Sequence, residues 1–397
     1  MFNLRHSLLH ASGLLILLAG CSTPRQDRPV APGTTVTATP PAAITATPPA
    51  ASAPALRPVK FAAMPGWQQD DLREALPVFR TSCEVLVRKP EWKEVCTIAR
   101  DVTATDANAV RLFFETFFTP HQVVNADGTD SGLITGYYEP LLNGSRKRTG
   151  VYQTPLHRVP DDLLNVDLSS VYPDLKSLRL RGRLQASKVV PYWTRAELFQ
   201  NDLLAGKELV WVDDAVDAFF LQVQGSGRVQ LADSKETIRL AYAEQNGFPY
   251  KSIGRYLVDR GELTLDQASA QSIKAWIAAH PTRRQEVLNA NPSYVFFREE
   301  KLTDAGKGPK GALGVSLTPQ RSIAIDPQFV PLGVPVFLAT TQPASDAPFQ
   351  RLMLAQDTGG AIRNPVRADV FWGFGSGAGE LAGKMKQRGM LWVLLPK

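Results

Sequence analysis

The order of apolar and polar positions predicts two helical regions in an otherwise β-rich chain. The first covers residues 66–117, and Pro77 should kink or split it. Its last part, residues 108–118, carries so many aromatic and aliphatic side chains that it predicts a largely buried helix or strand. The second region covers residues 262–290, where Pro281 ends one predicted helix and another helix follows.

Short β-prone runs bounded by Gly, Pro or Asp make up most of the remainder. We predict strands over residues 134–138, 209–212, 218–223, 229–231, 294–297, 322–325, 334–338, 351–355 and 391–395. Because long irregular connections join these short runs, they favour compact barrels over an open parallel sheet. The sequence contains no internal repeat with a fixed period.

Residues 1–20 have the pattern of a bacterial signal peptide. Their apolar run, residues 14–18, is too short to span a bilayer. The letters Leu-Ala-Gly-Cys that follow resemble a lipoprotein box, in which Cys21 becomes the lipidated first residue of the mature chain. Ser22 in place of an Asp favours the outer membrane, with the protein facing the periplasm. The alternative is an ordinary signal peptide with a chance cysteine near its cleavage site.

Residues 21–58 lack the large apolar side chains that a folded core needs. They contain nine prolines among many Ala and Thr residues. Such a segment is expected to be an extended, semi-rigid tether. Behind a lipid anchor, it would let the globular part reach away from the membrane. The alternative is a low-complexity tail without a role.

The overall composition indicates a globular protein of modest charge. The 397 residues, 44% of them hydrophobic, suffice for two or three domains. Lys and Arg number 44 against 38 Asp and Glu, and the net charge of +6 gives little support to nucleic-acid binding. The five histidines are scattered, and neither an HExxH nor a paired CxxC motif occurs, so we expect no metal site.

The three cysteines exclude a cysteine-dense scaffold. Apart from Cys21, they are Cys83 and Cys96, which suit a disulfide in an oxidising periplasm. Their disulfide would close a loop of about 13 residues around Pro90 and would contribute on the order of 3 kcal/mol. Two buried thiols are the alternative.

Three aspartates, Asp326, Asp357 and Asp369, lie at the ends of β-prone runs or just inside them. Carboxylates in such places, flanked by glycine, can converge at the mouth of one barrel. The alternative is that each Asp caps a turn, its commonest role beside Gly. The letters Asp357-Thr358-Gly359 also match the aspartic-peptidase signature. That chemistry needs two carboxylates that share a proton, and the signature occurs only once.

Aromatic and amide side chains elsewhere suit a sugar-binding site, because flat rings stack on pyranose faces and amides bind hydroxyl and N-acetyl groups. Tyr137 lies in one such segment. Gln222, Gln224 and Ser226 alternate along a second segment, which places three polar groups on one face if the segment is a strand. The alternatives are a core tyrosine and ordinary surface residues.

Several of these segments together resemble the membrane-bound lytic murein transglycosylase A family. The resemblance runs from about residue 60 to the C-terminus, and the lipoprotein box lies in the expected place. The C-terminal stretch also resembles a three-aspartate domain that occurs in other cell-wall-associated proteins. The matching segments are GYYEP (136–140), FFLQVQGSGRV (219–229), SYVFFRE (293–299), GALGVSLTPQRSIAIDP (311–327), VPLG (330–333), AQDTGGAI (355–362) and RADVFWG (367–373).

The resemblance implies a mainly β fold with flanking helices. Its core would be a double-psi β-barrel built from residues 59–140 and 292–397. An inserted second β-domain, residues 141–291, would form the other wall of a glycan cleft. The partners implied are peptidoglycan glycan strands and the outer-membrane lipid anchor, with no nucleic acid. Cell-wall synthesis or divisome proteins are further candidate partners.

The resemblance also implies a reaction: cleavage of the β-1,4 bond between N-acetylmuramic acid and N-acetylglucosamine, with formation of a 1,6-anhydro end. It gives Asp369 as the catalytic acid and then base, with Asp357 and Asp326 as supporting aspartates and no metal or organic cofactor. Asn364-Pro365 departs from the Gly-rich loop expected before Asp369. Two alternatives remain, a non-catalytic peptidoglycan-binding lipoprotein on the same barrel and an aspartic peptidase.

Overall fold

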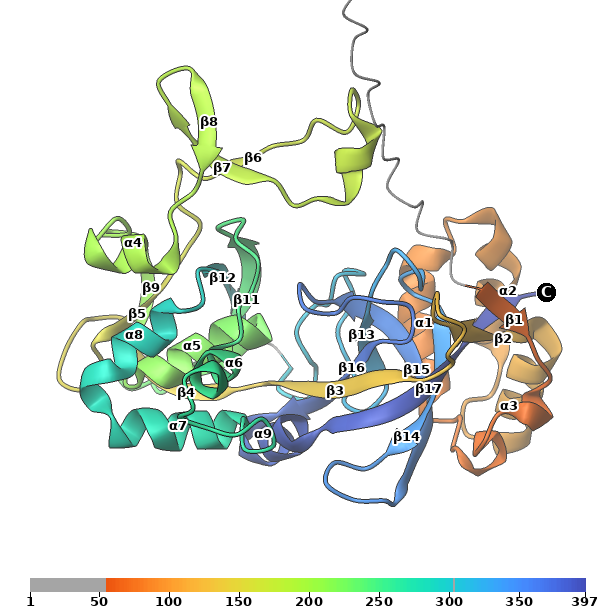
Figure 1. Cartoon of the computed structure of the whole chain (residues 1–397). Coiled ribbons are helices and arrows are strands. Elements are labelled where there is room, and N and C mark those ends of the chain that lie inside the picture. The colour runs from red at the N-terminus through yellow and green to blue at the C-terminus, as the bar shows by residue number, and fades with distance from the viewer. Residues whose placement is uncertain (1–54, 303) are drawn as a thin grey trace, which may run out of the picture. The chain divides into compact units, whose positions relative to one another are not determined.

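A computed structural model describes residues 55–302 and 304–397 of the chain (Figure 1). The predicted signal peptide, Cys21 and most of the predicted tether lie outside the described residues. The predicted end of the tether at residue 58 was wrong, because β1 (Ala55–Pro58) pairs antiparallel with β2 (Phe118–Val124). A segment with few large side chains can still join a sheet edge through its backbone hydrogen bonds.

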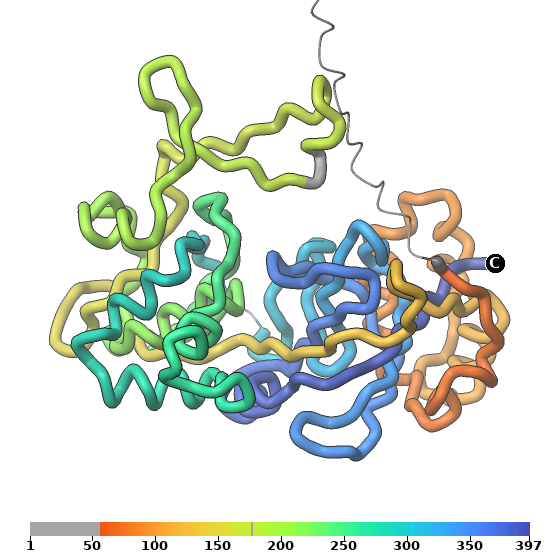
Figure 2. Tube along the Cα trace, in the orientation of Figure 1, coloured from red at the N-terminus to blue at the C-terminus, as the bar shows by residue number. Residues whose placement is uncertain are grey.

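Six strands close into a barrel. Around the barrel the order is β17, β14, β15, β13, β16 and β3, and pairing of β3 with β17 completes the circle. β3 thus lies beside strands from the C-terminal end of the chain (Figure 2). The bounds are β3 (Gly132–Glu139), β13 (Ser322–Ile325), β14 (Pro335–Thr341), β15 (Pro348–Thr358), β16 (Ala368–Phe374) and β17 (Lys386–Pro396).

Three helices accompany the barrel: α1 (Ala75–Leu86), α2 (Pro90–Asp101) and α3 (Ala107–Phe117) (Figure 1). The predicted break at Pro77 does not occur. Pro77 is the third residue of α1, where its missing N–H would have had no partner within the helix. A disulfide between Cys83 and Cys96 joins α1 to α2, with 5.4 Å between the two Cα atoms.

A second sheet has the strand order β12, β11, β10, β4, β9, β5. β12 continues this sheet past the insert boundary that the sequence predicted at 291, because β12 pairs with β11 along its whole length. The bounds are β4 (Leu141–Ser145), β5 (Thr154–His157), β9 (Glu208–Val212), β10 (Ser226–Leu231), β11 (Thr237–Gln245) and β12 (Val295–Lys301).

Helices of this region pack on this sheet or on one another, and a small third sheet follows β5 in the chain. The helices are α4 (Arg195–Gln200), α5 (Ala215–Gln224), α6 (Ile253–Asp259), α7 (Ala270–Ala279) and α8 (Arg284–Asn289). The third sheet consists of β6 (Leu164–Asn165), β7 (Arg181–Gln185) and β8 (Lys188–Pro191). α9 (Gly375–Lys384) connects β16 to β17. The protein is therefore a mixed α/β protein with more strand than helix, a six-stranded barrel plus another sheet.

The strand predicted at 218–223 was wrong, since these residues belong to helix α5. Asp214 caps α5 by accepting hydrogen bonds from two backbone N–H groups, and Gly225 ends it with φ of 84°. One side of α5 packs on the apolar core of the second sheet and another side on the core formed with α6, α7 and α8. A short helix buried on two sides has a continuous apolar run, which periodicity alone cannot distinguish from a buried strand.

A buried ion cluster lies where the chain passes from the barrel strand β3 to the second sheet. Glu139 at the end of β3 is fully buried and accepts hydrogen bonds from Arg228 Nε (2.8 Å) and Arg239 Nε (2.5 Å). The same guanidinium groups donate to the backbone carbonyls of Ala305 and Lys307, where the chain returns toward the barrel. One carboxylate and its two arginines thus form hydrogen bonds with both segments that connect the barrel to the second sheet.

Candidate active site

Two of the three predicted aspartates lie level with each other on either side of β13. Ala324 of β13 pairs with Asp357 of the parallel strand β15 and with Asp369 of the antiparallel strand β16. Both aspartates are partly buried. Strand pairing therefore brings together two carboxyl groups that the sequence separates.

One carboxyl oxygen of Asp369 accepts a hydrogen bond from a described residue, and the other does not. The Thr135 hydroxyl donates to Asp369 Oδ1 at 2.6 Å, and no described residue forms a hydrogen bond to Oδ2. Burial raises the pKa of Asp369, and the nearby charge of Asp357 raises it further. The Thr135 hydrogen bond and the Arg367 guanidinium act in the opposite direction on this pKa. A protonated carboxyl group and its carboxylate are thus both supported at this position.

Both carboxylate oxygens of Asp357 accept hydrogen bonds. The Tyr137 hydroxyl donates to Oδ2 and the Ala312 N–H donates to Oδ1, each at 2.9 Å. Burial raises the pKa of Asp357. Burial also raises the pKa of Tyr137 well above its ordinary value, and Asp357 adds to that shift, so the phenol keeps its proton and remains a donor.

One strand provides both hydroxyl donors. Thr135 and Tyr137 are two residues apart on β3 and therefore face the same side. Thr135 pairs directly with Asp369 in the parallel register of β3 and β16. Sequence reasoning missed Thr135 and Arg367, although each lies two residues from a predicted site residue. Gly136 between the two donors is required by space, because a Cβ there would lie 2.5 Å from Trp372 Nε1.

Asp326 contacts a loop rather than the other two aspartates. Its buried carboxylate accepts the N–H groups of Gln328 at 3.2 Å and Asn364 at 3.1 Å. Asn364 has a left-handed backbone with φ of 96°, a conformation that Asn adopts more readily than most residues other than Gly. This accounts for Asn in a loop that was expected to be Gly-rich. Asp326 thereby fixes the loop that leads into β16 and Asp369.

The three polar residues predicted on one strand face are separated, because their segment changes from helix to strand at Gly225. Gln224 Oε1 accepts the backbone N–H of Tyr138 at 3.1 Å, which ties α5 to β3. Gln222 is buried and accepts a hydrogen bond from Arg195 at 2.6 Å. Ser226 is a buried residue of β10. Among the three, only Gln224 forms a hydrogen bond with the strand that carries Thr135 and Tyr137 in the described residues.

Comparison with known proteins identifies the family. Residues 133–298 match the MltA specific insert domain, and residues 321–395 match the 3D domain. Membrane-bound lytic murein transglycosylase A of Escherichia coli K12 is 32% identical over 279 residues, which are 69% of this chain and 68% of that protein. The chain belongs to the membrane-bound lytic murein transglycosylase A family. It is thus an enzyme of the lytic murein transglycosylase class, which acts on peptidoglycan, and the non-catalytic alternative is not retained.

Solved structures of this family have the same fold. MltA from Neisseria gonorrhoeae is 39% identical with a TM-score of 0.73, over 85% of this chain and 92% of that chain. The lytic transglycosylase LtgG of Burkholderia pseudomallei is 48% identical with a TM-score of 0.59, over 86% and 95%. E. coli MltA with bound chitohexaose is 26% identical with a TM-score of 0.63, over 81% and 90%.

The described part of this family member contains no helix long and apolar enough to cross a membrane. The same residues contain no group of three or more His, Cys, Asp or Glu side chains arranged to hold a metal ion.

Proposed function

We propose that this enzyme cleaves the β-1,4 bond between N-acetylmuramic acid and N-acetylglucosamine in peptidoglycan and leaves a 1,6-anhydro end, with Asp369 as acid and then base. One observation carries the proposal: Asp369 is a carboxyl group with a raised pKa, one anchored oxygen and one free oxygen. The glycan oligomer bound by E. coli MltA supports glycan strands as the ligand.

The reaction needs one group that gives a proton and later takes one. Protonated Asp369 donates its proton to the glycosidic oxygen as the bond from that oxygen to the sugar C1 breaks. The C6 hydroxyl oxygen of the same sugar forms the new bond to C1, and the Asp369 carboxylate accepts the hydroxyl proton. No water is consumed, and the carboxyl group ends the cycle protonated. The Thr135 hydrogen bond and Arg367 stabilise the intermediate carboxylate.

Asp357 is the less suitable acid, because both of its oxygens already accept hydrogen bonds. We assign it the roles of raising the Asp369 pKa and of holding Tyr137, and we assign Asp326 the role of holding the loop before β16. The aspartic-peptidase alternative needs two carboxyl groups that share a proton. In the described residues each carboxyl group is bonded to its own hydroxyl donor instead.

Tyr137 and Gln224 remain our proposed contacts to the glycan or its immediate support. Gln222 and Ser226 stay untested predictions as glycan ligands, and neither forms a hydrogen bond with β3 in the described residues. We also propose that the barrel is of the double-psi type, which the two parallel strand pairs support. The insert of this proposal begins after Glu139 and extends through β12.

The decisive test compares Asp369→Asn, Asp357→Asn and the exposed-turn control Asp346→Asn at equal folded concentration. Mass spectrometry of digested peptidoglycan measures the release of anhydro-ended muropeptides. We expect the rate of muropeptide release to fall by at least about 10²–10⁴-fold in Asp369→Asn and by a smaller factor in Asp357→Asn. The control should release muropeptides at the rate of the parent. An active Asp369→Asn with an inactive Asp357→Asn would move the acid to Asp357. Activity in both would place the catalytic group elsewhere.

For its location, we propose a lipid anchor at Cys21 in the outer membrane, facing the periplasm, which the membrane-bound relatives support. Metabolic labelling with palmitate should mark the parent and not Cys21→Ala. Equal label on both proteins would refute the anchor.

A further inference from the structure

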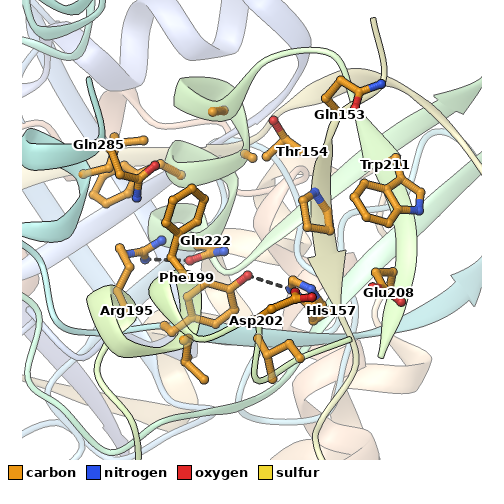
Figure 3. Close-up of a pocket in the computed structure, with 18 of the residues that line it drawn as sticks. Gln153, Thr154, His157, Arg195, Phe199, Asp202, Glu208, Trp211, Gln222 and Gln285 are labelled. Carbon is orange, nitrogen blue, oxygen red and sulfur yellow. Dashed lines mark hydrogen bonds between the residues drawn. The ribbon is translucent and has the colours of Figure 1, made fainter. Parts of the chain in front are cut away.

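A cavity of about 400 Å³ lies within the second sheet and its helices (Figure 3). Its walls come from β5, β9, α4, α5 and α8 and from the segments beside them, and none of the three aspartates lines it. The volume is within the range of small-molecule sites. The proposed reaction uses no residue of this cavity.

Arg195 in the cavity wall is a buried cation without an anion. Its Nε donates to the Asn291 carbonyl at 3.1 Å, and its Nη2 donates to Gln222 Oε1 and the Ser293 carbonyl, both at 2.6 Å. Among the described residues, Nη1 has no hydrogen-bond acceptor and no carboxylate pairs with this guanidinium. Burial lowers the pKa of Arg195 to about 10. A buried charge is costly unless it is paired, so an anionic group in the cavity would bind favourably beside Nη1.

The side of the cavity opposite Arg195 is acidic. Asp202 and Glu208 lie there beside His157 (Figure 3). Neither carboxylate forms an ion pair with a described residue. His157 exchanges a hydrogen bond of 2.8 Å with the Tyr294 hydroxyl, and burial lowers its pKa to about 4, so it is neutral near pH 7. The cavity therefore offers a cation at one end and two acidic side chains at the other.

Apolar side chains separate these two ends. Leu198, Leu204 and Phe219 are buried in the wall, and Trp211 and the exposed Phe199 also line it. Arg148, Arg284 and Asp202 lie exposed at the lining, where water screens their charges, whereas Glu208 is half-buried. A ligand that fits needs a carboxylate, an ammonium group and a short apolar portion between them.

We propose that this cavity binds a short peptide with two free ends, with the carboxylate at Arg195 and the ammonium group at Asp202 and Glu208. A free dipeptide carries these two charges at its opposite ends, with apolar atoms between them. A stem peptide attached to peptidoglycan does not fit, because its amino end is joined to the sugar by an amide bond, so the ligand we infer is a free short peptide. The site would bind this peptide apart from the glycan chemistry at Asp369.

The test is calorimetric titration of the full-length protein with D-alanyl-D-alanine, its N-acetyl form and its C-terminal amide. The N-acetyl form lacks the ammonium group, and the amide lacks the carboxylate. We expect saturable binding of the free dipeptide and at least about tenfold weaker binding of each derivative, because each derivative lacks one of the two charged groups that hydrogen-bond in the cavity. Equal binding of all three, or no saturable binding of the dipeptide, overturns the proposal.

Two variants test which residues bind the carboxylate and the ammonium group of the peptide. Arg195→Met should abolish the preference for the free carboxylate. Since that change also removes three structural hydrogen bonds, Asp202→Asn gives a second test. Asp202 has φ of 47°, which Asn tolerates, so the fold should persist. Asp202→Asn should lose most of the preference for the free ammonium group and keep the preference for the carboxylate. An unchanged preference for the free ammonium group in Asp202→Asn contradicts the proposal.

The control is Asp346→Asn, which makes the same change of charge on an exposed turn of the barrel and should bind like the parent. Release of anhydro-ended muropeptides is measured on the same preparations. A chain that releases them but does not bind the dipeptide overturns this inference alone. A chain that binds the dipeptide but releases none overturns the proposed function alone.

Discussion

Thr135 is the only described side chain that donates a hydrogen bond to Asp369. A hydrogen bond to a carboxylate favours its charged form, so this bond lowers the Asp369 pKa against the effect of burial. The balance between these two influences sets the pH range in which Asp369 carries the proton that the reaction needs. A single hydroxyl group on a neighbouring strand thus lowers the pKa of the proposed catalytic acid.

Thr135→Val removes that hydroxyl with little change of shape. The pKa of Asp369 should rise, and the alkaline limb of the pH profile of kcat/KM should move to higher pH. The measurement is kcat/KM for release of anhydro-ended muropeptides between pH 4 and pH 9. Thr237→Val, on a strand of the second sheet, is the control and should leave the profile in place. An alkaline limb that stays at the parent's pH would show that Thr135 does not act on Asp369.

The raised pKa of Asp369 also has a consequence for stability. A folded-state pKa above the ordinary value means that the folded protein binds the proton more tightly than the unfolded chain. Stability is therefore lost as pH rises from the ordinary Asp value through the raised one. Ionised Asp369 destabilises the fold near neutral pH, and protonated Asp369 does not.

Asp369→Asn should therefore raise the melting temperature at pH 7.5, by about 2–4 °C for each kcal/mol of destabilisation removed. The gain should shrink at pH 4, where the parent carboxyl group is more fully protonated. Thermal melts of both proteins at the two pH values measure this. Asp346→Asn serves as the control without a pH-dependent gain. A gain of equal size at both pH values would contradict the assignment.

At the scale of elements, α5 connects the second sheet to the active-site strand. Its Gln224 side chain accepts the Tyr138 N–H, directly beside Tyr137. Asp214 fixes the start of the helix through hydrogen bonds from the N–H groups of Val216 and Asp217. Helix formation at these residues thus depends on capping as well as on burial.

Asp214→Ala should destabilise the protein by about 1 kcal/mol, since two backbone N–H groups lose their acceptor. Urea denaturation followed by tryptophan fluorescence measures the free energy of unfolding. The neighbouring Asp213→Ala removes the same charge but no helix cap, because Asp213 accepts from the Asn143 side chain. Equal losses in the two variants would indicate an effect of charge and not of the cap.

At the scale of the whole molecule, the Glu139 cluster joins the two passages of the chain between the barrel and the second sheet. One carboxylate satisfies two guanidinium groups that are themselves nearly buried. Loss of its charge leaves two cations in a medium that hydrates them poorly. We therefore expect the largest single-residue effect on stability outside the apolar core at this position.

Glu139→Gln should lower the free energy of unfolding by about 3–5 kcal/mol in urea. The matched control is Glu299→Gln, which breaks the bidentate pair with Arg146 at a partly exposed site on the second sheet and should change stability by about 0–1 kcal/mol. If the two variants lose the same stability, the buried cluster is not a principal support of the junction.

The sequence alone determined about half of the described strands, among them five of the six barrel strands, together with the helical regions at 66–117 and 262–290 and the pair Asp357 and Asp369. It did not predict the barrel strand β16. Strands such as β13 and β14 are short, mostly apolar runs with Pro at or close to one end, so local pattern suffices to define them. An Asp near the end of such a run and close to Gly, such as Asp357, can also be recognised from its neighbours in the sequence. The resemblance to a family rested on these same short segments.

Only the tertiary structure decided the partners of those residues. Thr135 binds Asp369 because β3 and β16, 234 residues apart at this contact, pair in parallel. No local pattern encodes a pairing register across such a separation. Residues 218–223 form a helix and not a strand because two apolar cores cover them, which hides the helical period. Glu139 and Arg195 are polar residues whose burial depends on segments brought together by folding, and their chemistry follows from that burial.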